Sequence, residues 1–243
     1  MGLTLRDLSL KIAGNVIFQS LNLQLNPKEI HVLLGPNGIG KSSLLKAVAG
    51  HTDYVPCAGK IFIGNEDISQ SLPEVRAQKG VFVAFQNPAE IEGLSVANFL
   101  RTTLKAYPQN PAHHCSATQF YQYLYGLLAQ VGLPKEFTSR SINLGFSGGE
   151  KKRFELLQLL LFKPAFALLD ELDSGLDVDA KKLVASVIAK LQEEGMSFLV
   201  VSHDIEFIRS LNPTYLHVFK EQSLVPADIS TLDKIEAQGF CTL

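Results

Sequence analysis

The chain has 243 residues, 46% of them hydrophobic, which is enough for one large domain with a full hydrophobic core. Its formal charge of −2 and isoelectric point of about 6.3 give no overall basic field, which argues against nucleic-acid binding through bulk charge. Its three cysteines stand far apart without a CxxC pair, and no apolar run reaches about 18 residues, so we expect reduced thiols, a cytoplasmic location and no membrane-inserted segment.

The first predicted elements are strands. Residues 3–25 alternate apolar and polar positions around a turn near residues 13–15, which predicts two antiparallel strands. Residues 29–34 end in a buried strand, and residues 43–49 form a helix that stops at Gly50. Residues 59–64 predict another short strand, which we expect to join the antiparallel layer.

A glycine-rich loop joins the buried strand to the helix. It fits the phosphate-loop pattern, in which Gly is followed by four residues and then by Gly-Lys-Ser. Glycines let successive N–H groups and the positive helix end face a phosphate. Lys41 would reach the β- and γ-phosphates, and Ser42 would hold Mg²⁺. The alternative is a turn with a solvated lysine. The ATP-binding residues that we expect are Gly35, Pro36, Asn37, Gly38, Gly40, Lys41, Ser42 and Ser43.

The middle of the chain has a different composition. Residues 81–85 predict a buried strand, and Gln86 follows at the strand end, where open α/β sheets bind ligands. We interpret residues 88–163 as a helical subdomain inserted into an ATP-binding core of residues 1–87 and 164–243. The helices within it are expected after Ser95 and at about 117–131. The alternative is that these helices simply cover the sheet.

The insertion also contains His113-His114-Cys115, which could suggest a metal site. Adjacent residues seldom converge on one ion without distant ligands, and no carboxylate or second cysteine pair stands nearby. We therefore predict a flexible polar loop here.

A second phosphate-facing helix start is predicted at Phe146-Ser147-Gly148-Gly149-Glu150, before an amphipathic helix over residues 151–162. Ser147 can cap this helix, and the two glycines leave its N-terminus open to an anion. An ordinary cap accounts for Ser147 and one glycine. It does not account for Glu150 directly after Gly-Gly.

Two carboxylates end the next strand, which spans residues 166–169. Asp170 and Glu171 need a cation, a donor or water, because burying them unpaired costs several kcal/mol. A Mg²⁺ ion beside the phosphate loop meets that need. Asp170 would support the metal, and Glu171 would take a proton from the attacking water. The alternative is an exposed acidic turn.

The last part of the chain predicts a helix and two strands. Residues 173–177 lead into a helix over 178–194 with an apolar core face. A buried strand at 197–201 precedes His203, which would contact the γ-phosphate or would simply be hydrogen-bonded. Residues 215–219 predict the last strand, and the tail from residue 221 carries no specific signal.

Together these motifs resemble an ABC-type ATPase along nearly the whole chain. They stand in the family's order: the phosphate loop, Gln86, Ser147-Gly148-Gly149, Asp170-Glu171, Ser174-Gly175-Leu176-Asp177 and His203. Three longer runs, at residues 85–93, 145–153 and 170–177, are similar to SufC-type ATPases of the Suf iron–sulfur cluster assembly system. Transporter ATPases usually carry Gln where Glu150 stands.

The resemblance implies an α/β fold, a RecA-like P-loop core with an antiparallel β layer and a helical subdomain. It also implies a transient head-to-tail pair of copies, in which the signature residues of one copy close on the ATP of the other. Gln86 would sense metal and water, and Asp177 would cross the interface. Closure would act on a SufB and SufD scaffold through the region after Gln86, and the scaffold would hold the cluster. The signature residues are Ser147, Gly148, Gly149 and Glu150.

Three departures from the family pattern are visible. Ile12 stands about where many ABC ATPases stack adenine on an aromatic ring, Ser202-His203-Asp204 replaces Thr-His-Tyr, and residues 220–225 lack the usual turn glycine. Two other functions stay open. One is the ATP-binding subunit of a membrane ABC transporter, and the other is a regulatory module with little hydrolysis, against which Glu171 argues.

Overall fold

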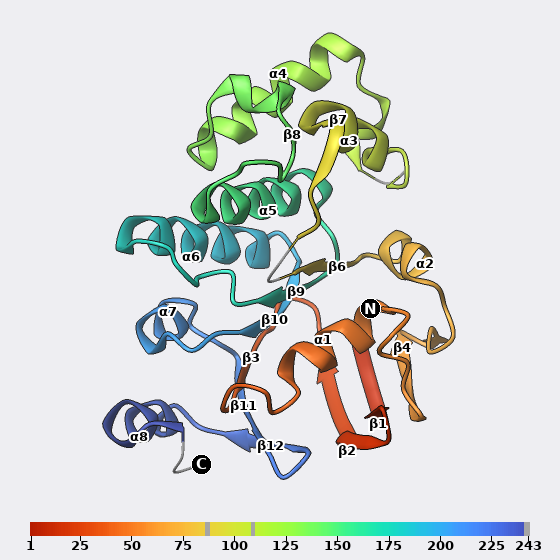
Figure 1. Cartoon of the computed structure of the whole chain (residues 1–243), viewed down its shortest axis with the longest axis vertical. Coiled ribbons are helices and arrows are strands. Elements are labelled where there is room, and N and C mark those ends of the chain that lie inside the picture. Colours follow the sequence, from red (N-terminus) through yellow and green to blue (C-terminus); the bar gives the residue numbers. More distant parts are fainter. Residues whose placement is uncertain (86–87, 108–109, 241–243) are drawn as a thin grey trace.

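The computed structural model describes residues 1–85, 88–107 and 110–240. Its centre is a six-stranded sheet in the order β12-β11-β3-β10-β9-β6 (Figure 1). Every pair in it is parallel except β11 with β12. The strands are β3 (Ile30–Leu34), β6 (Val81–Ala84), β9 (Phe166–Asp170), β10 (Ser197–Val201), β11 (Tyr215–Lys220) and β12 (Ser223–Ala227).

The predicted antiparallel layer is a separate sheet in the order β2-β1-β4-β5. β1 pairs with β2 across the turn at Ala13 and Gly14, and β4 pairs with the other edge of β1. A third, two-stranded sheet joins β7 to β8. The bounds are β1 (Leu3–Ile12), β2 (Asn15–Leu25), β4 (Ala58–Ile63), β5 (Glu66–Asp67), β7 (Ile91–Ser95) and β8 (Ser141–Ile142).

Helices cover both faces of the parallel sheet (Figure 1). The α-helices are α1 (Lys41–Ala49), α2 (Pro73–Gln78), α3 (Val96–Leu104), α4 (Ala117–Gln130), α5 (Gly148–Phe162), α6 (Val178–Glu193), α7 (Ile205–Ser210) and α8 (Ser230–Gln238). Two short 3₁₀ helices are η1 (Pro111–His114) and η2 (Lys135–Ser139).

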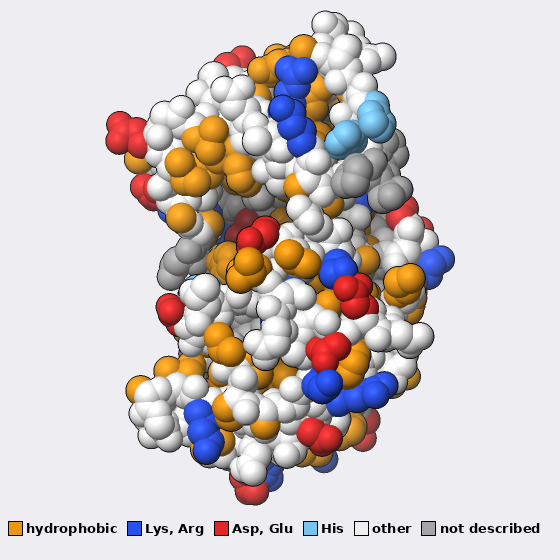
Figure 2. All heavy atoms as spheres, turned by 90° about the vertical axis from the view of Figure 1, so that its right-hand side faces the viewer, with side chains coloured by type: hydrophobic (Ala, Val, Ile, Leu, Met, Phe, Trp, Pro, Cys, Tyr) orange, Lys and Arg blue, Asp and Glu red, His pale blue; other side chains and the backbone are white. Residues whose placement is uncertain are grey.

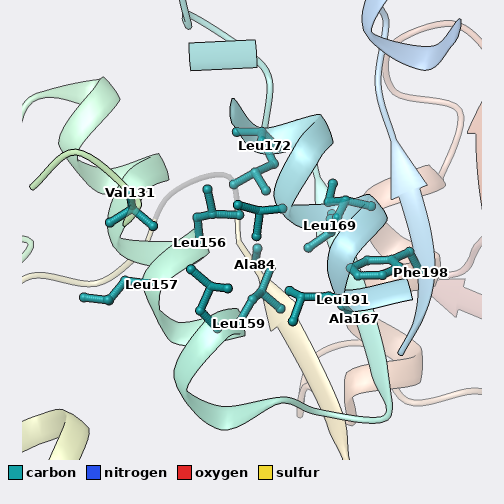
Figure 3. Close-up of a cluster of buried hydrophobic side chains, with 14 of the residues drawn as sticks. Ala84, Val131, Leu156, Leu157, Leu159, Ala167, Leu169, Leu172, Leu191 and Phe198 are labelled. Atoms are coloured by element: carbon teal, nitrogen blue, oxygen red, sulfur yellow. The ribbon is translucent and has the colours of Figure 1, made fainter. Parts of the chain in front are cut away.

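The parallel sheet separates two hydrophobic cores. Successive side chains of a strand point to opposite faces, so Phe166 and Leu168 of β9 pack with α1 and the antiparallel sheet. Ala167 and Leu169 pack on the other face with α5 and α6 (Figure 3). Burying each large side chain stabilises the fold by about 1.5–3 kcal/mol. These two cores hold the strand ends, and hence the site, in place.

The prediction that the helix after Ser147 is amphipathic is wrong. α5 lies between α4 and α6, so both its faces are covered. Even Lys152 and Glu155 are only 8% and 4% exposed. The core cluster runs through α3, α4 and α5 to the sheet, and the division into residues 88–163 and a core of 1–87 and 164–243 stays a prediction.

The prediction of an unspecific tail after a last strand at residues 215–219 is also wrong. β12 pairs with β11, and α8 follows. The hairpin turn is made by Glu221 and Gln222, with φ of 47° and 65°. Two positive-φ residues are what a two-residue hairpin turn needs, and here neither is glycine.

A loop was predicted at His113-His114-Cys115, but the two histidines belong to the 3₁₀ helix η1, and Cys115 follows it. Asn110 caps η1 through a bond from the Ala112 N–H, and its own amide donates to the Leu161 carbonyl. This buried anchor orders the segment. Within the described residues, no group of three or more His, Cys, Asp or Glu side chains could hold a metal ion.

Candidate nucleotide site

The phosphate loop follows β3 and ends where α1 begins, at Lys41. Gly35 has φ of 146° and Gly40 has φ of 117°, values that L side chains rarely adopt. A Cβ on Gly40 would lie 2.9 Å from Ile17 Cγ2, and one on Gly35 would lie 3.1 Å from the Phe219 carbonyl oxygen. These two glycines are therefore required by the packing of the chain on itself.

The lysine of the loop is folded across it. Lys41 is 5% exposed, and its Nζ donates to the carbonyl oxygens of Gly35 at 2.7 Å and Pro36 at 2.8 Å. Burial lowers the pKa of Lys41, while the charges of Glu171 and Asp170 oppose that change. Those two carboxylates therefore stabilise the charged form of the ammonium group.

A hydroxyl and a carboxylate meet beside the lysine. Ser42 Oγ donates to Asp170 Oδ1 at 3.1 Å, which joins the start of α1 to the end of β9. Asp170 is 4% exposed, and burial raises its pKa, while the Ser42 hydrogen bond opposes the rise. Hydroxyl and carboxylate oxygens are ligands of the kind that Mg²⁺ takes in phosphate sites. The pair therefore fits a magnesium ion.

Glu171, which follows β9, and His203, which follows β10, face each other. Glu171 adopts a left-handed backbone with φ of 52°, and its N–H donates to the Val201 carbonyl at 3.0 Å. Its Oε1 lies 3.6 Å from His203 Nε2. That nitrogen is buried without a hydrogen-bond partner among the residues that the structure describes. Burial, and then the charge of Lys41, lower the pKa of His203, which favours the neutral imidazole.

Glu171 and His203 line a cleft of about 420 Å³. Its lining comes from the phosphate loop, from the segment after β9, from α6 and from the segment after β10. The lining residues are Asn37, Glu171, Asp173, Ser174, Gly175, Lys181, His203 and Asp204.

Part of this lining was missed by the sequence analysis. Ser202 Oγ donates to Asp173 Oδ2 at 2.8 Å and accepts from the Asp204 N–H at 3.0 Å, and Asp204 pairs with Lys181. This network ties the loop after Glu171 to the loop that carries His203. The only sequence signal was that Ser202 and Asp204 flank His203 and that Asp173 follows the carboxylate pair.

The signature residues form a complete cap at the start of α5. Ser147 Oγ accepts from the Glu150 N–H at 3.2 Å, and Glu150 Oε2 accepts from the Ser147 N–H at 2.8 Å. This capping box accounts for Glu150, so the expectation that an ordinary cap leaves it unexplained is wrong. A Cβ on Gly148 or Gly149 would meet nothing within 4 Å.

The remaining predicted site residues lie apart from the cleft or outside the description. Among the described residues that line the cleft, none belongs to the signature. Asp177 is exposed and caps α6 by accepting from the Ala180 N–H at 2.7 Å. Ile12 is the last residue of β1 in the antiparallel sheet and packs, partly buried, against the core on that side. Gln86 lies outside the described residues.

Comparisons with known proteins agree with this geometry. The ABC transporter family model matches residues 18–174. The chain is 36% identical over 240 residues to "Probable ATP-dependent transporter SufC" of Escherichia coli (strain K12), covering 98% of this chain and 97% of that protein. It is 38% identical over 242 residues to "Iron-sulfur cluster assembly protein SufC" of Plasmodium falciparum (isolate 3D7), covering 98% of this chain and 70% of that protein.

Solved structures show the same fold. "Structure of ATP binding subunit of ABC transporter" superposes with a TM-score of 0.80 at 21% identity, covering 99% of this chain and 94% of that one. The predicted RecA-like core with an antiparallel layer is thus confirmed. In the parts of the chain that the structure describes, no helix is both long enough and apolar enough to cross a bilayer.

Proposed function

Since the chain belongs to the ABC ATPase family and, within it, to the SufC group, we propose that it works as a transient head-to-tail pair serving iron–sulfur cluster assembly. Nucleotide binding and ATP hydrolysis come with the family, as the sequence predicted. The assignment of individual residues, the pairing and the scaffold are the parts that we propose.

The observation that carries the proposal is the convergence of two side-chain pairs beside the buried Lys41. Ser42 with Asp170, and Glu171 with His203, come from three separate segments and meet at the carboxyl ends of neighbouring strands. Lys41 would hold the β- and γ-phosphates of ATP, and the N–H groups of residues 37–43 would surround them.

The metal would be held by Ser42 and Asp170, with Gln86 in the role that the resemblance implies. A bound Mg²⁺ would neutralise charge on the phosphate oxygens. Glu171 would accept the proton of the attacking water, because its carboxylate is 22% exposed and faces the cleft. The Nε2 of His203, which is buried and makes no hydrogen bond to any described residue, would contact the γ-phosphate.

The second copy is proposed because the capping box explains Ser147 and Glu150 of the signature but does not explain Gly148 and Gly149. Gly148 and Gly149 leave the first turn of α5 uncovered, and none of the described residues that line the cleft belongs to the signature. In a head-to-tail pair, Ser147, Gly148, Gly149 and Glu150 of one copy would close on the ATP of the other, and Asp177 would lie at the interface. Each copy would supply the half that the other lacks.

The proposed partners are SufB- and SufD-like proteins in the cytoplasm. A mainly apolar cavity of about 350 Å³ lies between the end of α1, α2 and β6, and it includes Phe82, Phe85 and Tyr107. Figure 2 shows a face on which basic and acidic side chains are interspersed rather than gathered into one basic area. We propose that the scaffold docks at this cavity, beside the segment that begins at Gln86.

A pull-down tests the partner. The tagged chain is captured from the membrane-free fraction and, separately, from detergent-solubilised membranes of its own cells. We expect SufB- and SufD-like proteins in the first sample. Their absence, together with a permease in the second sample, would favour the membrane-transporter function instead.

A further inference from the structure

Arg140 lies beside the signature and was not singled out by any motif. It follows η2 and precedes β8, and its guanidinium carbon lies 4.5 Å from the ring centroid of Phe146 and 5.2 Å from that of Phe137. Its Nη2 donates to the Gly145 carbonyl at 3.0 Å. These contacts fix the guanidinium group in one orientation.

The remaining contact of this arginine is with the cap of α5. Arg140 Nη1 donates to Glu150 Oε1 at 2.5 Å, while Glu150 Oε2 accepts from the Ser147 N–H. Both carboxylate oxygens are thus held from two directions. The Ser147 backbone bond and then Arg140 lower the pKa of Glu150, so this carboxylate is charged at neutral pH.

A charged glutamate at this position has an electrostatic cost. The first turn of α5 is open to a phosphate group, and Glu150 stands at its third residue. A carboxylate there repels an incoming triphosphate and offsets the positive end of the helix dipole. A cation in direct contact removes most of that repulsion.

We propose that Arg140 is a positioning residue for the signature. It neutralises Glu150 and holds the first turn of α5 in the orientation that receives the partner copy's ATP. This inference rests on the proposed head-to-tail pairing. It explains how a chain with Glu150, rather than an uncharged side chain, keeps a phosphate-binding helix start.

The test removes the charge of Arg140 and then restores neutrality. Arg140→Gln is expected to raise the KM for ATP about tenfold while kcat changes less than threefold, since the residue touches no reacting atom. The added change Glu150→Gln is expected to return KM to within about threefold of the parent. Glutamine keeps the capping box, so the rescue reports charge rather than folding.

A matched control is an arginine within α5. Arg153 also donates to main-chain carbonyls, those of Val131 at 3.0 Å and Gly132 at 3.4 Å, and these hydrogen bonds lie away from the cap. Arg153→Gln is expected to lower the melting temperature without the tenfold rise in KM. An unchanged KM in Arg140→Gln, or no rescue by Glu150→Gln, would overturn the inference.

A measurement of pairing distinguishes the failure of this inference from the failure of the proposed function. In the Glu171→Gln background, the ATP concentration for half-maximal pairing is measured by light scattering with and without Arg140→Gln. A tenfold increase supports the inference, and an equal concentration overturns it alone. A Glu171→Gln parent that never pairs would contradict the proposed function, and this inference with it.

Discussion

The phosphate loop and the signature both contain glycines that we propose to face phosphate, yet the fold constrains the two sets differently. In the phosphate loop, Gly35 and Gly40 have positive φ and are pressed against Phe219 and Ile17, so the fold itself excludes a side chain. In the signature, Gly148 and Gly149 have free space where a side chain would stand. Contacts within one chain explain why glycine stands at residues 35 and 40, but they do not explain why glycine stands at residues 148 and 149.

Under the proposed pairing, this difference separates the half of the site that one chain completes from the half that the second copy completes. Lys41, Ser42, Asp170, Glu171 and His203 are held by internal contacts before any ligand binds. The signature is equally well ordered through its capping box, but a Cβ at Gly148 or Gly149 would meet none of the described residues within 4 Å. The close approach of a second molecule is the simplest reason for glycine at residues 148 and 149.

The largest expected effect comes from Glu171→Gln, in the half that the chain completes alone. Removing the proposed base should slow hydrolysis by about 10²- to 10⁴-fold and leave ATP affinity nearly unchanged. Steady-state phosphate release and calorimetry measure the two quantities. Turnover equal to that of the parent chain would remove Glu171 from its proposed role.

The next effect is on nucleotide affinity. Lys41→Ala removes a charge-assisted contact to the phosphates, so ATP should bind about 10- to 100-fold more weakly in calorimetry. Lys163→Ala is a suitable control, because that lysine pairs with Glu194 at the opposite end of the sheet. Normal ATP binding by Lys41→Ala would show that the phosphate loop is misassigned.

The comparison is tested directly by one alanine in each loop. Gly40→Ala should destabilise the fold by about 1–3 kcal/mol, because its Cβ meets Ile17 in a left-handed backbone. Gly149→Ala should leave the melting temperature equal or higher, since alanine favours a helix, but should lower ATP turnover about tenfold. Equal losses of stability in both variants would erase the distinction between the loops.

A smaller effect concerns the buried His31 and the half-buried His217, which lie away from the site. His217 Nε2 lies 3.1 Å from His31 Nδ1, and His31 Nε2 lies 3.1 Å from Glu29 Oε2. Burial, with the neighbouring His31, lowers the pKa of His217 to about 4. Between pH 6.5 and about 4 the unfolded chain therefore binds a proton that the folded chain does not, and acid favours unfolding.

We expect the free energy of unfolding to fall by about 2 kcal/mol across that window through His217. Urea titrations at several pH values measure this fall. His217→Gln should flatten the slope, while neither loop variant should change it. A variant slope as steep as that of the parent chain would assign the acid sensitivity to other groups.

The sequence predicted the elements that carry the candidate site better than it predicted the elements around them. The phosphate loop, the strand before it and the carboxylate pair carry local signals, since glycine spacing and apolar runs act within a few residues. The β11–β12 hairpin was missed because Glu221 and Gln222 take a turn usually marked by glycine. The charged residues Lys152 and Glu155 made α5 look amphipathic in the sequence. Its burial depends on helices that are distant in the sequence.

The side-chain contacts between loops also could not be predicted from local sequence patterns. Arg140 reaches Glu150 across ten residues, and Ser202 reaches Asp173 across 29. Neither pair has a spacing that a helix or strand would mark. Such contacts become visible only when the fold brings the two segments together.

The central claim is that two copies share each ATP. Light scattering of the Glu171→Gln chain with and without ATP tests it most directly. The account predicts a particle of one 26.6 kDa chain without nucleotide and of two chains with ATP. A single chain that binds ATP in calorimetry yet never pairs, or a stable pair without nucleotide, would contradict it.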